Sequence, residues 1–209
     1  MKDFSAYLCV LCAKDFFQRR DRRDTQRTAE KTHKPMKKAS ILEEPSRKGR
    51  EEFLAAVRRS RKLHRGWVSP PGTTERFDAY LARLRKGTHL SYWVRTEDGE
   101  LAGVFSINEI VRGIFCSGYL GYYAFEPHAG RGYMKKGLCA VLSEAFGRKR
   151  LHRLEANIQP ENEASRRLVQ SAGFRLEGFS RRYLKIAGRW RDHERWAITA
   201  EEWRSRSRK

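Results

Sequence analysis

The sequence is poor in cysteine and has no long apolar run. Its four cysteines, at positions 9, 12, 116 and 139, are too few and too scattered for a disulfide-stapled fold. Cys9 and Cys12 form a C-x-x-C pair, but no second ligand pair or nearby histidine completes a zinc site. The apolar run from Phe4 to Ala13 is too short to cross a bilayer. We therefore expect a cytoplasmic protein with no bound metal and no membrane association, in which Cys116 and Cys139 are buried.

Acidic residues are scarce relative to basic ones. The chain has 45 Lys and Arg against 25 Asp and Glu, a formal net charge of +20. Residues 1–40 contain 11 basic and 5 acidic residues, so +14 of the net charge falls on the remainder. A nucleic-acid or ribosome partner is one explanation, because phosphate contacts depend on cationic charge. A solvated basic surface that attracts an anionic cofactor is the other, and no recognised nucleic-acid motif decides between them.

Composition divides the chain into one domain with two basic ends. Residues 1–35 are rich in charge from position 18 onward, which predicts a poorly ordered and dispensable N-terminal extension. Residues 36–203 have the length and apolar content of a single domain. Residues 204–209 read as a basic tail.

The hydrophobic pattern predicts an α/β domain of strands packed on helices. Thr73 or Thr74 is the expected N-cap of the second helix and Gly87 its stop. The expected strands are 38–43, 90–95, 101–107, 115–125, 153–158 and a last pair around Ala187–Gly188. The expected helices are 49–63, 74–86, one after position 132, and 162–172.

The stretch from Tyr122 to Leu142 is the most informative part of the chain. It reads as a strand, a glycine-containing turn (H-A-G-R-G-Y, residues 128–133) and an amphipathic helix. Glycines allow close approach of the backbone to a bound group, and a helix start presents unpaired N–H groups to it. Arg131, Lys135 and Lys136 add positive charge. These features predict a site for a phosphate-bearing cofactor.

Two common nucleotide motifs do not fit this turn. A dinucleotide fingerprint needs a third glycine where Lys135 stands. A P-loop needs Lys and Ser or Thr after its last glycine, but Leu138 and Cys139 follow Gly137.

The C-terminal half carries further ordered motifs. A-N-x-x-P-x-N-x-x-S begins at Ala156 and ends at Ser165, followed by G-F at Gly173 and E-G at Glu177. Together with the glycine turn, these motifs resemble the GNAT acetyltransferase superfamily, and within it the ribosomal-protein-alanine N-acetyltransferases. The resemblance spans roughly positions 38–203. It implies a mixed, mostly antiparallel sheet that is splayed at the cofactor site and flanked by helices.

The resemblance also implies a reaction and a set of site residues. Acetyl-CoA is the implied donor and a primary amine the acceptor. The serine of N-x-x-S is the implied proton donor to the leaving thiolate. Asn157 could instead end strand pairing, Asn162 could be a helix cap, and His128 could face solvent. The implied cofactor-binding residues are Tyr123, Ala124, Phe125, His128, Ala129, Gly130, Arg131, Gly132, Tyr133, Asn157, Asn162 and Ser165.

The chemistry needs an acid and a route to a neutral amine. Ser165 is the first candidate acid and Tyr183 the alternative. Glu109 is the best candidate base, with Glu155 and Glu177 behind it. An α-amine has a pKa of about 8 and a lysine amine one of about 10.4, so a site without a strong base suits an α-amine better. We expect three further side chains, Trp190, Trp196 and His193, to be non-catalytic, the tryptophans packed in a terminal hairpin and His193 on its surface.

Three functions follow in order of preference. The first is acetylation of an N-terminal α-amine, with a ribosomal protein as the best guess and possible association with the ribosome. The second is acetylation of a small-molecule amine, which would differ in the acceptor loops at 65–74 and 113–116. The third is a non-catalytic basic protein that binds RNA or ribosomes, which predicts steeply salt-dependent RNA affinity.

Overall fold

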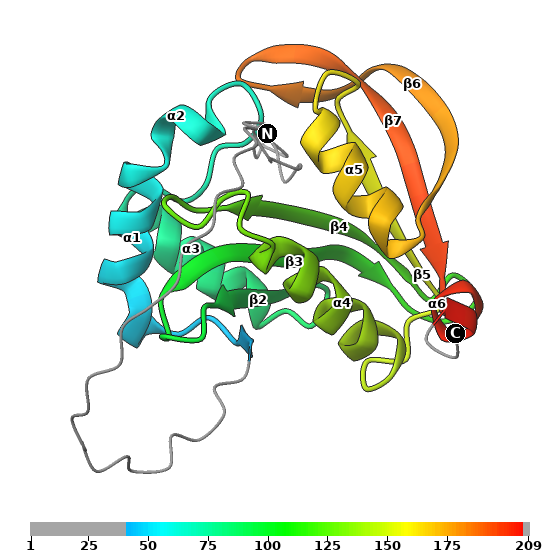
Figure 1. Ribbon diagram of the computed structural model, residues 1–209, viewed down its shortest axis with the longest axis horizontal. Coiled ribbons are helices and arrows are strands. Elements are labelled where there is room, and N and C mark those ends of the chain that lie inside the picture. The colour runs from blue at the N-terminus through cyan, green and yellow to red at the C-terminus, as the bar shows by residue number, and fades with distance from the viewer. Residues whose placement is uncertain (1–40, 207–209) are drawn as a thin grey trace, which may run out of the picture.

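A seven-stranded sheet forms the centre of the computed structural model, which describes residues 41–206 (Figure 1). The strand order is β1-β2-β3-β4-β5-β7-β6, and every neighbouring pair is antiparallel except β4 and β5. The predicted mixed, mostly antiparallel α/β sheet is confirmed. The strands are β1 (Leu42–Glu43), β2 (Leu90–Arg95), β3 (Leu101–Val111), β4 (Ser117–Ala124), β5 (Arg153–Ile158), β6 (Arg175–Ile186) and β7 (Arg189–Thr199).

Helices cover both faces of this sheet. Helices α1, α2 and α3 lie on one face, and α4 and α5 lie on the other (Figure 1). The helices are η1 (Arg47–Gly49), α1 (Arg50–Arg59), α2 (Arg61–His64), α3 (Thr74–Leu84), α4 (Tyr133–Phe146), α5 (Glu163–Ala172) and α6 (Ala200–Arg206). The last helix crosses position 203, where a basic tail was expected to begin. The N-terminal extension expected at 1–35 and the first half of the strand expected at 38–43 fall outside the described residues, and the rest of that strand includes β1.

The helix expected over 49–63 is divided in two at Ser60. The Ser60 backbone leaves the helical region, with φ −94° and ψ 13°. Its hydroxyl accepts a hydrogen bond from the backbone N–H of Glu126 at 2.9 Å. A contact 66 residues away along the chain therefore sets the break, and local periodicity does not reveal it.

Capping residues set the ends of α3 and α5. The Thr73 side chain accepts from the backbone N–H of Arg76 at 3.4 Å, which makes Thr73 the N-cap of α3. The Asn162 side chain accepts from the backbone N–H of Ser165 at 3.1 Å. Gly173, with φ +96°, ends α5 in the left-handed conformation that favours glycine.

An aromatic cluster fixes α1 and α3 against the sheet. The Phe53 ring lies 5.1 Å from the Phe77 ring and 5.7 Å from those of Trp93 and Phe125, measured between centroids. All four side chains are fully buried. Because Phe125 directly follows β4, this cluster also anchors the start of the glycine turn.

The sheet opens between β4 and β5. The two parallel strands pair only at Ser117 with Arg153, Gly118 with Leu154 and Tyr119 with Glu155. Beyond Tyr119, β4 continues on β3 and β5 continues on β7, with no bonds between them. We call this opening, between 120–124 of β4 and 156–158 of β5, the strand split.

Two further expectations differ from the structure. Cys116 and Cys139 are half-buried, not buried. The Cys116 thiol donates to the carbonyl oxygen of Arg150 at 3.0 Å, which holds it near the surface. The strand expected at 115–125 runs only from Ser117 to Ala124.

Candidate functional site

The glycine turn connects the open end of β4 to the start of α4. Gly130 and Gly132 have φ of +78° and +85°, and nothing lies within 4 Å of where a Cβ would stand at either position. Gly132 is the N-cap of α4 and has no side chain to satisfy the first N–H groups of the helix. The turn therefore offers unpaired backbone donors and free space at the end of the strand split, as an anion site requires.

The side chains around the turn are less available than its backbone. His128 is buried, and its Nε2 lies 3.1 Å from a carboxylate oxygen of Glu100. Lys136 is turned toward Glu97, with Nζ 2.8 Å from the carboxylate. That hydrogen bond from Lys136 is the main reason why the pKa of Glu97 falls to about 2. Arg131 is exposed and carries no such partner among the described residues. Lys135 is likewise exposed and forms no ion pair among the described residues, so two of the three cations expected at the phosphates are not engaged by an acid.

Tyr122 and Ser165 form a buried pair on the α5 side of the split. The Tyr122 hydroxyl lies 2.7 Å from the Ser165 hydroxyl. Ser165 is 0% exposed, and its backbone N–H is bonded to Asn162. The structure thus brings Asn162 and Ser165 to the wall of the split, with the cap role of Asn162 in place. Its side-chain oxygen accepts from the first turn of α5, so Asn162 acts as a helix cap at this wall.

The opposite face of β4 carries Tyr123 and its helix contacts. Successive strand residues point to opposite faces, so Tyr123 faces α2. Its ring lies 5.4 Å from that of His64, whose Nε2 bonds the carbonyl of Ala124 at 2.8 Å. Burial lowers the pKa of His64, which keeps the ring neutral with Nε2 as the donor. Tyr123 and Ala124 are thereby held in place, which fixes the edge of β4 along the split.

Asn157 lies on the part of β5 that borders the split. It is buried, and its Oδ1 has no hydrogen-bond partner among the described residues. A buried polar atom left unpaired costs about 1–3 kcal/mol. An unpaired amide oxygen at this place fits a donor supplied by a ligand.

Tyr183 reaches the strand split from β6. It is hydrogen-bonded to Tyr119, the last residue of β4 that pairs with β5. Burial is the main cause of the raised pKa of Tyr119, and the bond to Tyr183 adds to it. Because Tyr119 and Tyr122 point to opposite faces of β4, the two candidate acids, Tyr183 and Ser165, lie on opposite sides of the split.

None of the three expected carboxylates is a free base at the split. Glu109 sits in a β-bulge with φ +48°, and its carboxylate lies 3.3 Å from His89, on the β2 side of β3. Glu155 and Glu177 are both bonded to Arg153. Arg153 lowers the pKa of Glu177. The structure therefore does not bring Glu109 to the split, and both Glu155 and Glu177 are hydrogen-bonded to Arg153.

The terminal hairpin differs from expectation at two residues. His193 was expected on the surface and is 0% exposed, because the Tyr183 ring packs 6.1 Å from it. Its Nδ1 bonds the carbonyl of Arg191 at 3.0 Å, its Nε2 has no partner among the described residues, and burial lowers its pKa. Trp196 is packed as expected, but Trp190 is 60% exposed. Sequence pattern missed His193 because a hairpin edge usually faces solvent.

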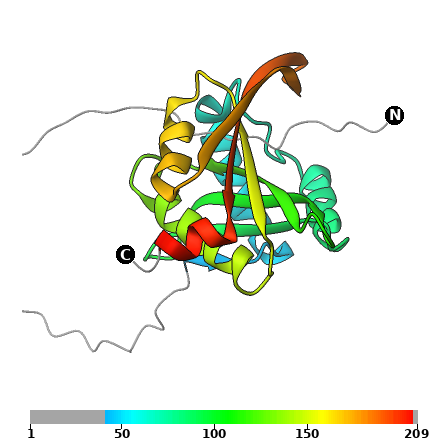
Figure 2. The ribbon, with the colours of Figure 1, turned by 90° about the vertical axis from the view of Figure 1, so that its right-hand side faces the viewer.

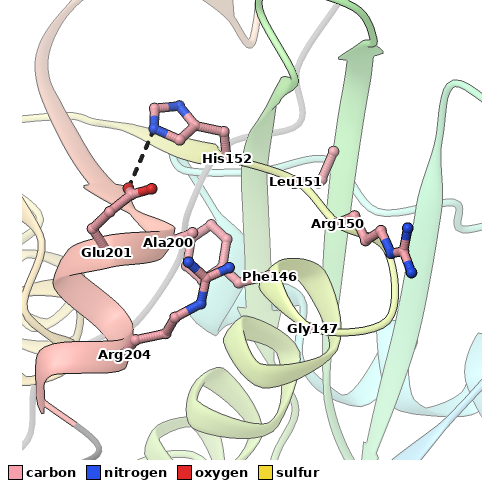
Figure 3. A pocket seen from close by; sticks show the side chains of 8 residues that line it. All are labelled: Phe146, Gly147, Arg150, Leu151, His152, Ala200, Glu201 and Arg204. Carbon is pink, nitrogen blue, oxygen red and sulfur yellow. Dashed lines mark ion pairs between the residues drawn. The ribbon is translucent and has the colours of Figure 1, made fainter.

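A separate hollow lies at the far end of α4 (Figure 3). It has a volume of about 480 Å³ and lies between the end of α4 and α6. His152 and Glu201 pair across it, with 3.3 Å between Nε2 and a carboxylate oxygen. Because the glycine turn is at the other end of α4, this hollow is not part of the strand split. Its lining is Phe146, Gly147, Arg150, Leu151, His152, Ala200, Glu201 and Arg204.

Residues 41–206 contain neither a membrane-spanning helix nor a cluster of metal ligands. No helix there has the length and apolarity to span a bilayer. No group of three or more His, Cys, Asp or Glu side chains in that range is placed to hold a metal ion.

Comparison with known proteins points to one family. The model of the acetyltransferase (GNAT) domain matches residues 40–175. The probable N-acetyltransferase YjcK of Bacillus subtilis is 36% identical over 128 residues, 61% of this chain and 71% of that protein. The [ribosomal protein uS5]-alanine N-acetyltransferase of Escherichia coli is also 36% identical, over 51% of this chain and only 55% of its own length.

Solved structures share the fold. RimJ of Mycobacterium smegmatis in complex with CoA-disulfide has a TM-score of 0.70 at 29% identity, covering 77% of this chain and 82% of that one. Spermidine N-acetyltransferase of Vibrio cholerae in complex with CoA and spermine has a TM-score of 0.68 at 19% identity, over 78% and 96% of the two chains, which shows the fold alone. The chain belongs to the GNAT family of N-acetyltransferases.

Proposed function

We propose that this N-acetyltransferase uses acetyl-CoA to acetylate the N-terminal α-amine of a protein, with a ribosomal protein as the preferred acceptor. The observation that carries the proposal is the strand split that ends in an uncapped glycine turn. The curated relative that acts on ribosomal protein uS5 and the RimJ structure that contains CoA-disulfide support the choice of acceptor and donor.

The residues present fit a CoA group along the split. The backbone amides from Ala129 to Tyr133 would hold its pyrophosphate, with Arg131 adding charge. Tyr123, Ala124 and Phe125 border the split, but the Phe125 N–H donates to the Ala102 carbonyl and the Ala124 carbonyl accepts from His64. The amides of the CoA arm would therefore bond other backbone groups of β4 at 120–124, the part that does not pair with β5. The unpaired Oδ1 of Asn157 fits a donor on the other wall. Bound in this way, acetyl-CoA supplies the thioester carbonyl that the amine attacks.

Ser165 is the preferred proton donor to the departing sulfur. Tyr122 holds the Ser165 hydroxyl from 2.7 Å, so its direction is fixed before the reaction. Tyr183 lies on the other side of β4, where it would border the acceptor. We assign Ser165 to the leaving group and Tyr183, next to the buried His193, to the acceptor side.

None of the three carboxylates expected as a base is free at the split in the described part of the chain, which favours an α-amine. At pH 7.4, deprotonating an α-amine costs under about 1 kcal/mol, whereas a lysine amine costs about 4 kcal/mol. Arg153 already forms ion pairs with Glu155 and Glu177, so these carboxylates add little attraction for a polycationic amine. A small-molecule amine remains the second candidate, supported by the fold shared with the spermidine enzyme.

An acceptor panel tests the proposal. Peptides with the N-terminal sequences of ribosomal proteins are compared with the same peptides blocked at the α-amine but carrying an internal lysine, and with spermidine. We expect acetyl transfer to the free α-amines alone. Turnover of spermidine but of no peptide would favour the second candidate, and no turnover of acetyl-CoA with any acceptor would remove both.

A further inference from the structure

The β6–β7 hairpin extends beyond the sheet as a two-stranded arm. The pairing of β7 with β5 stops at Glu194 and Ile158, whereas β6 and β7 continue to pair as far as Ile186 with Arg189. Figure 2 shows the hairpin rising away from the body of the molecule. We call residues 181–191 the arm.

The arm carries positive charge without any acid. Its eleven residues, R-R-Y-L-K-I-A-G-R-W-R, include five Lys and Arg and no Asp or Glu. Four of them, Arg181, Arg182, Arg189 and Arg191, are exposed and form no ion pair among the described residues. Elsewhere in the described residues acids stand among the cations, and some pair with them, as Glu43 does with Arg95 and Glu155 with Arg153. The arm differs from the rest of the basic surface in having no acid within its eleven residues.

An aromatic side chain stands among these cations. Trp190 is 60% exposed and lies between Arg189 and Arg191 in sequence. On the two-stranded arm it pairs with Lys185 across the strands. Because successive strand residues point to opposite faces, Trp190 shares its face with Lys185, whereas Arg189 and Arg191 point to the other face. The exposed ring offers a flat surface for an unstacked base, and the guanidinium groups suit phosphates.

We propose that the arm binds single-stranded or loop RNA. The charge complements a polyanion, and the exposed ring adds a surface on which an unpaired base can stack. A two-stranded ribbon does not enter the deep, narrow major groove of double-stranded RNA, so unpaired segments are the better fit. None of the arm arginines belongs to the strand split, so the RNA measurement stands apart from the acetyl-transfer proposal, although the arm also contains Tyr183, which is assigned to the acceptor side.

The expected binding has a calculable salt dependence. Four phosphate contacts to single-stranded RNA give a slope of about −2.8 for log affinity against log salt. Between 50 and 200 mM salt, that slope lowers the affinity about 50-fold. Replacing Arg189 and Arg191 by glutamine removes two contacts and reduces the slope by about 1.4.

Fluorescence anisotropy of the full chain with a labelled 20-nucleotide unstructured RNA tests the proposal. The arm variant Arg189→Gln/Arg191→Gln is compared with the control Arg85→Gln/Lys86→Gln, which removes the same charge from exposed residues at the end of α3. We expect the arm variant to lose at least tenfold in affinity at 100 mM salt and the control to lose less than threefold. Trp190→Ala should lose at least about fivefold with an unchanged salt slope.

Three results would overturn the proposal. The first is no RNA binding by the wild type at 100 mM salt. The second is equal weakening in the arm and control variants, which would mean that net charge alone attracts RNA. The third is displacement of the RNA by polyglutamate or by phosphatidylglycerol vesicles added at the same concentration of negative charge. That result would mean that the arm binds an acidic protein or a membrane surface. Melting curves of each variant verify that it is folded.

Discussion

Replacing Ser165 by alanine separates its chemical role from its structural one. The side chain is fully buried, and its hydroxyl lies 2.7 Å from the Tyr122 hydroxyl. Losing that hydrogen bond should lower the free energy of unfolding by about 1 kcal/mol. The cap from Asn162 goes to the backbone N–H of Ser165 and survives the change. For a domain of this size, the melting temperature should fall by about 2–4 °C.

The expected loss of activity is larger. A proton donor in the transition state contributes about 10²–10⁴-fold, equivalent to roughly 3–5 kcal/mol. We expect Ser165→Ala to lower kcat at least 100-fold with little change in the KM for acetyl-CoA. Tyr122→Phe keeps the serine but loses its orienting partner, so its kcat should fall about tenfold for a similar loss of stability.

The assay measures release of free CoA thiol at saturating acetyl-CoA, with melting curves taken on the same samples. The double variant should behave as Ser165→Ala alone in kcat, because Tyr122 acts through the serine. If Ser165→Ala kept a third or more of the wild-type kcat while losing the expected stability, the serine would be a structural residue. The proton would then have to come from elsewhere.

Three further changes test the packing and the charges. Gly137→Ala should destabilise the fold by about 1–3 kcal/mol, because the new Cβ would lie 2.7 Å from Val94 Cγ2. Alanine favours helices, so a gain in stability in a denaturant titration would contradict this clash. Asn162→Ala should cost about 1 kcal/mol through the lost cap, seen in the same titration, and no loss would show that the cap bond is unimportant. The pKa of His64 is lowered in the fold, so the unfolded chain takes up a proton at this residue more readily, and stability falls as the pH drops below about 6.5. His64→Gln should therefore make the melting temperature fall less between pH 7 and pH 5. An unchanged pH profile would refute this assignment.

Local pattern predicts the regular elements of this fold well. Strands Leu90–Arg95 and Arg153–Ile158 end where the sequence places them, because buried runs bounded by polar turns leave little choice of register. The helix broken at Ser60 shows where such reasoning stops. Its break depends on a hydrogen bond to Glu126, and no local signal marks it.

The candidate site divides in the same way. The sequence predicts the glycine turn because backbone φ angles of +78° and +85° favour glycine, so the residue type marks the conformation. The sequence does not predict the catalytic base, because whether a carboxylate is engaged by a cation depends on contacts between residues far apart in the chain. Glu109 faces His89, and Glu177 faces Arg153. His193 is hidden by the Tyr183 ring across the hairpin, a contact that no spacing rule predicts.

Binding of acetyl-CoA to the glycine turn is the central claim, and calorimetry with Gly132→Glu tests it most directly. This substitution places a side chain and a negative charge where the pyrophosphate would lie. Gly87→Glu is the matched control, because Gly87 also has a positive φ (+75°) and open space around it. Gly87 was the expected stop of α3, but the helix ends earlier, at Leu84 with Arg85 as its C-cap, so Gly87 lies in the turn that follows. We predict micromolar binding by the wild type and the control, and none by Gly132→Glu. Equal binding by all three proteins would contradict the placement of the cofactor on this turn.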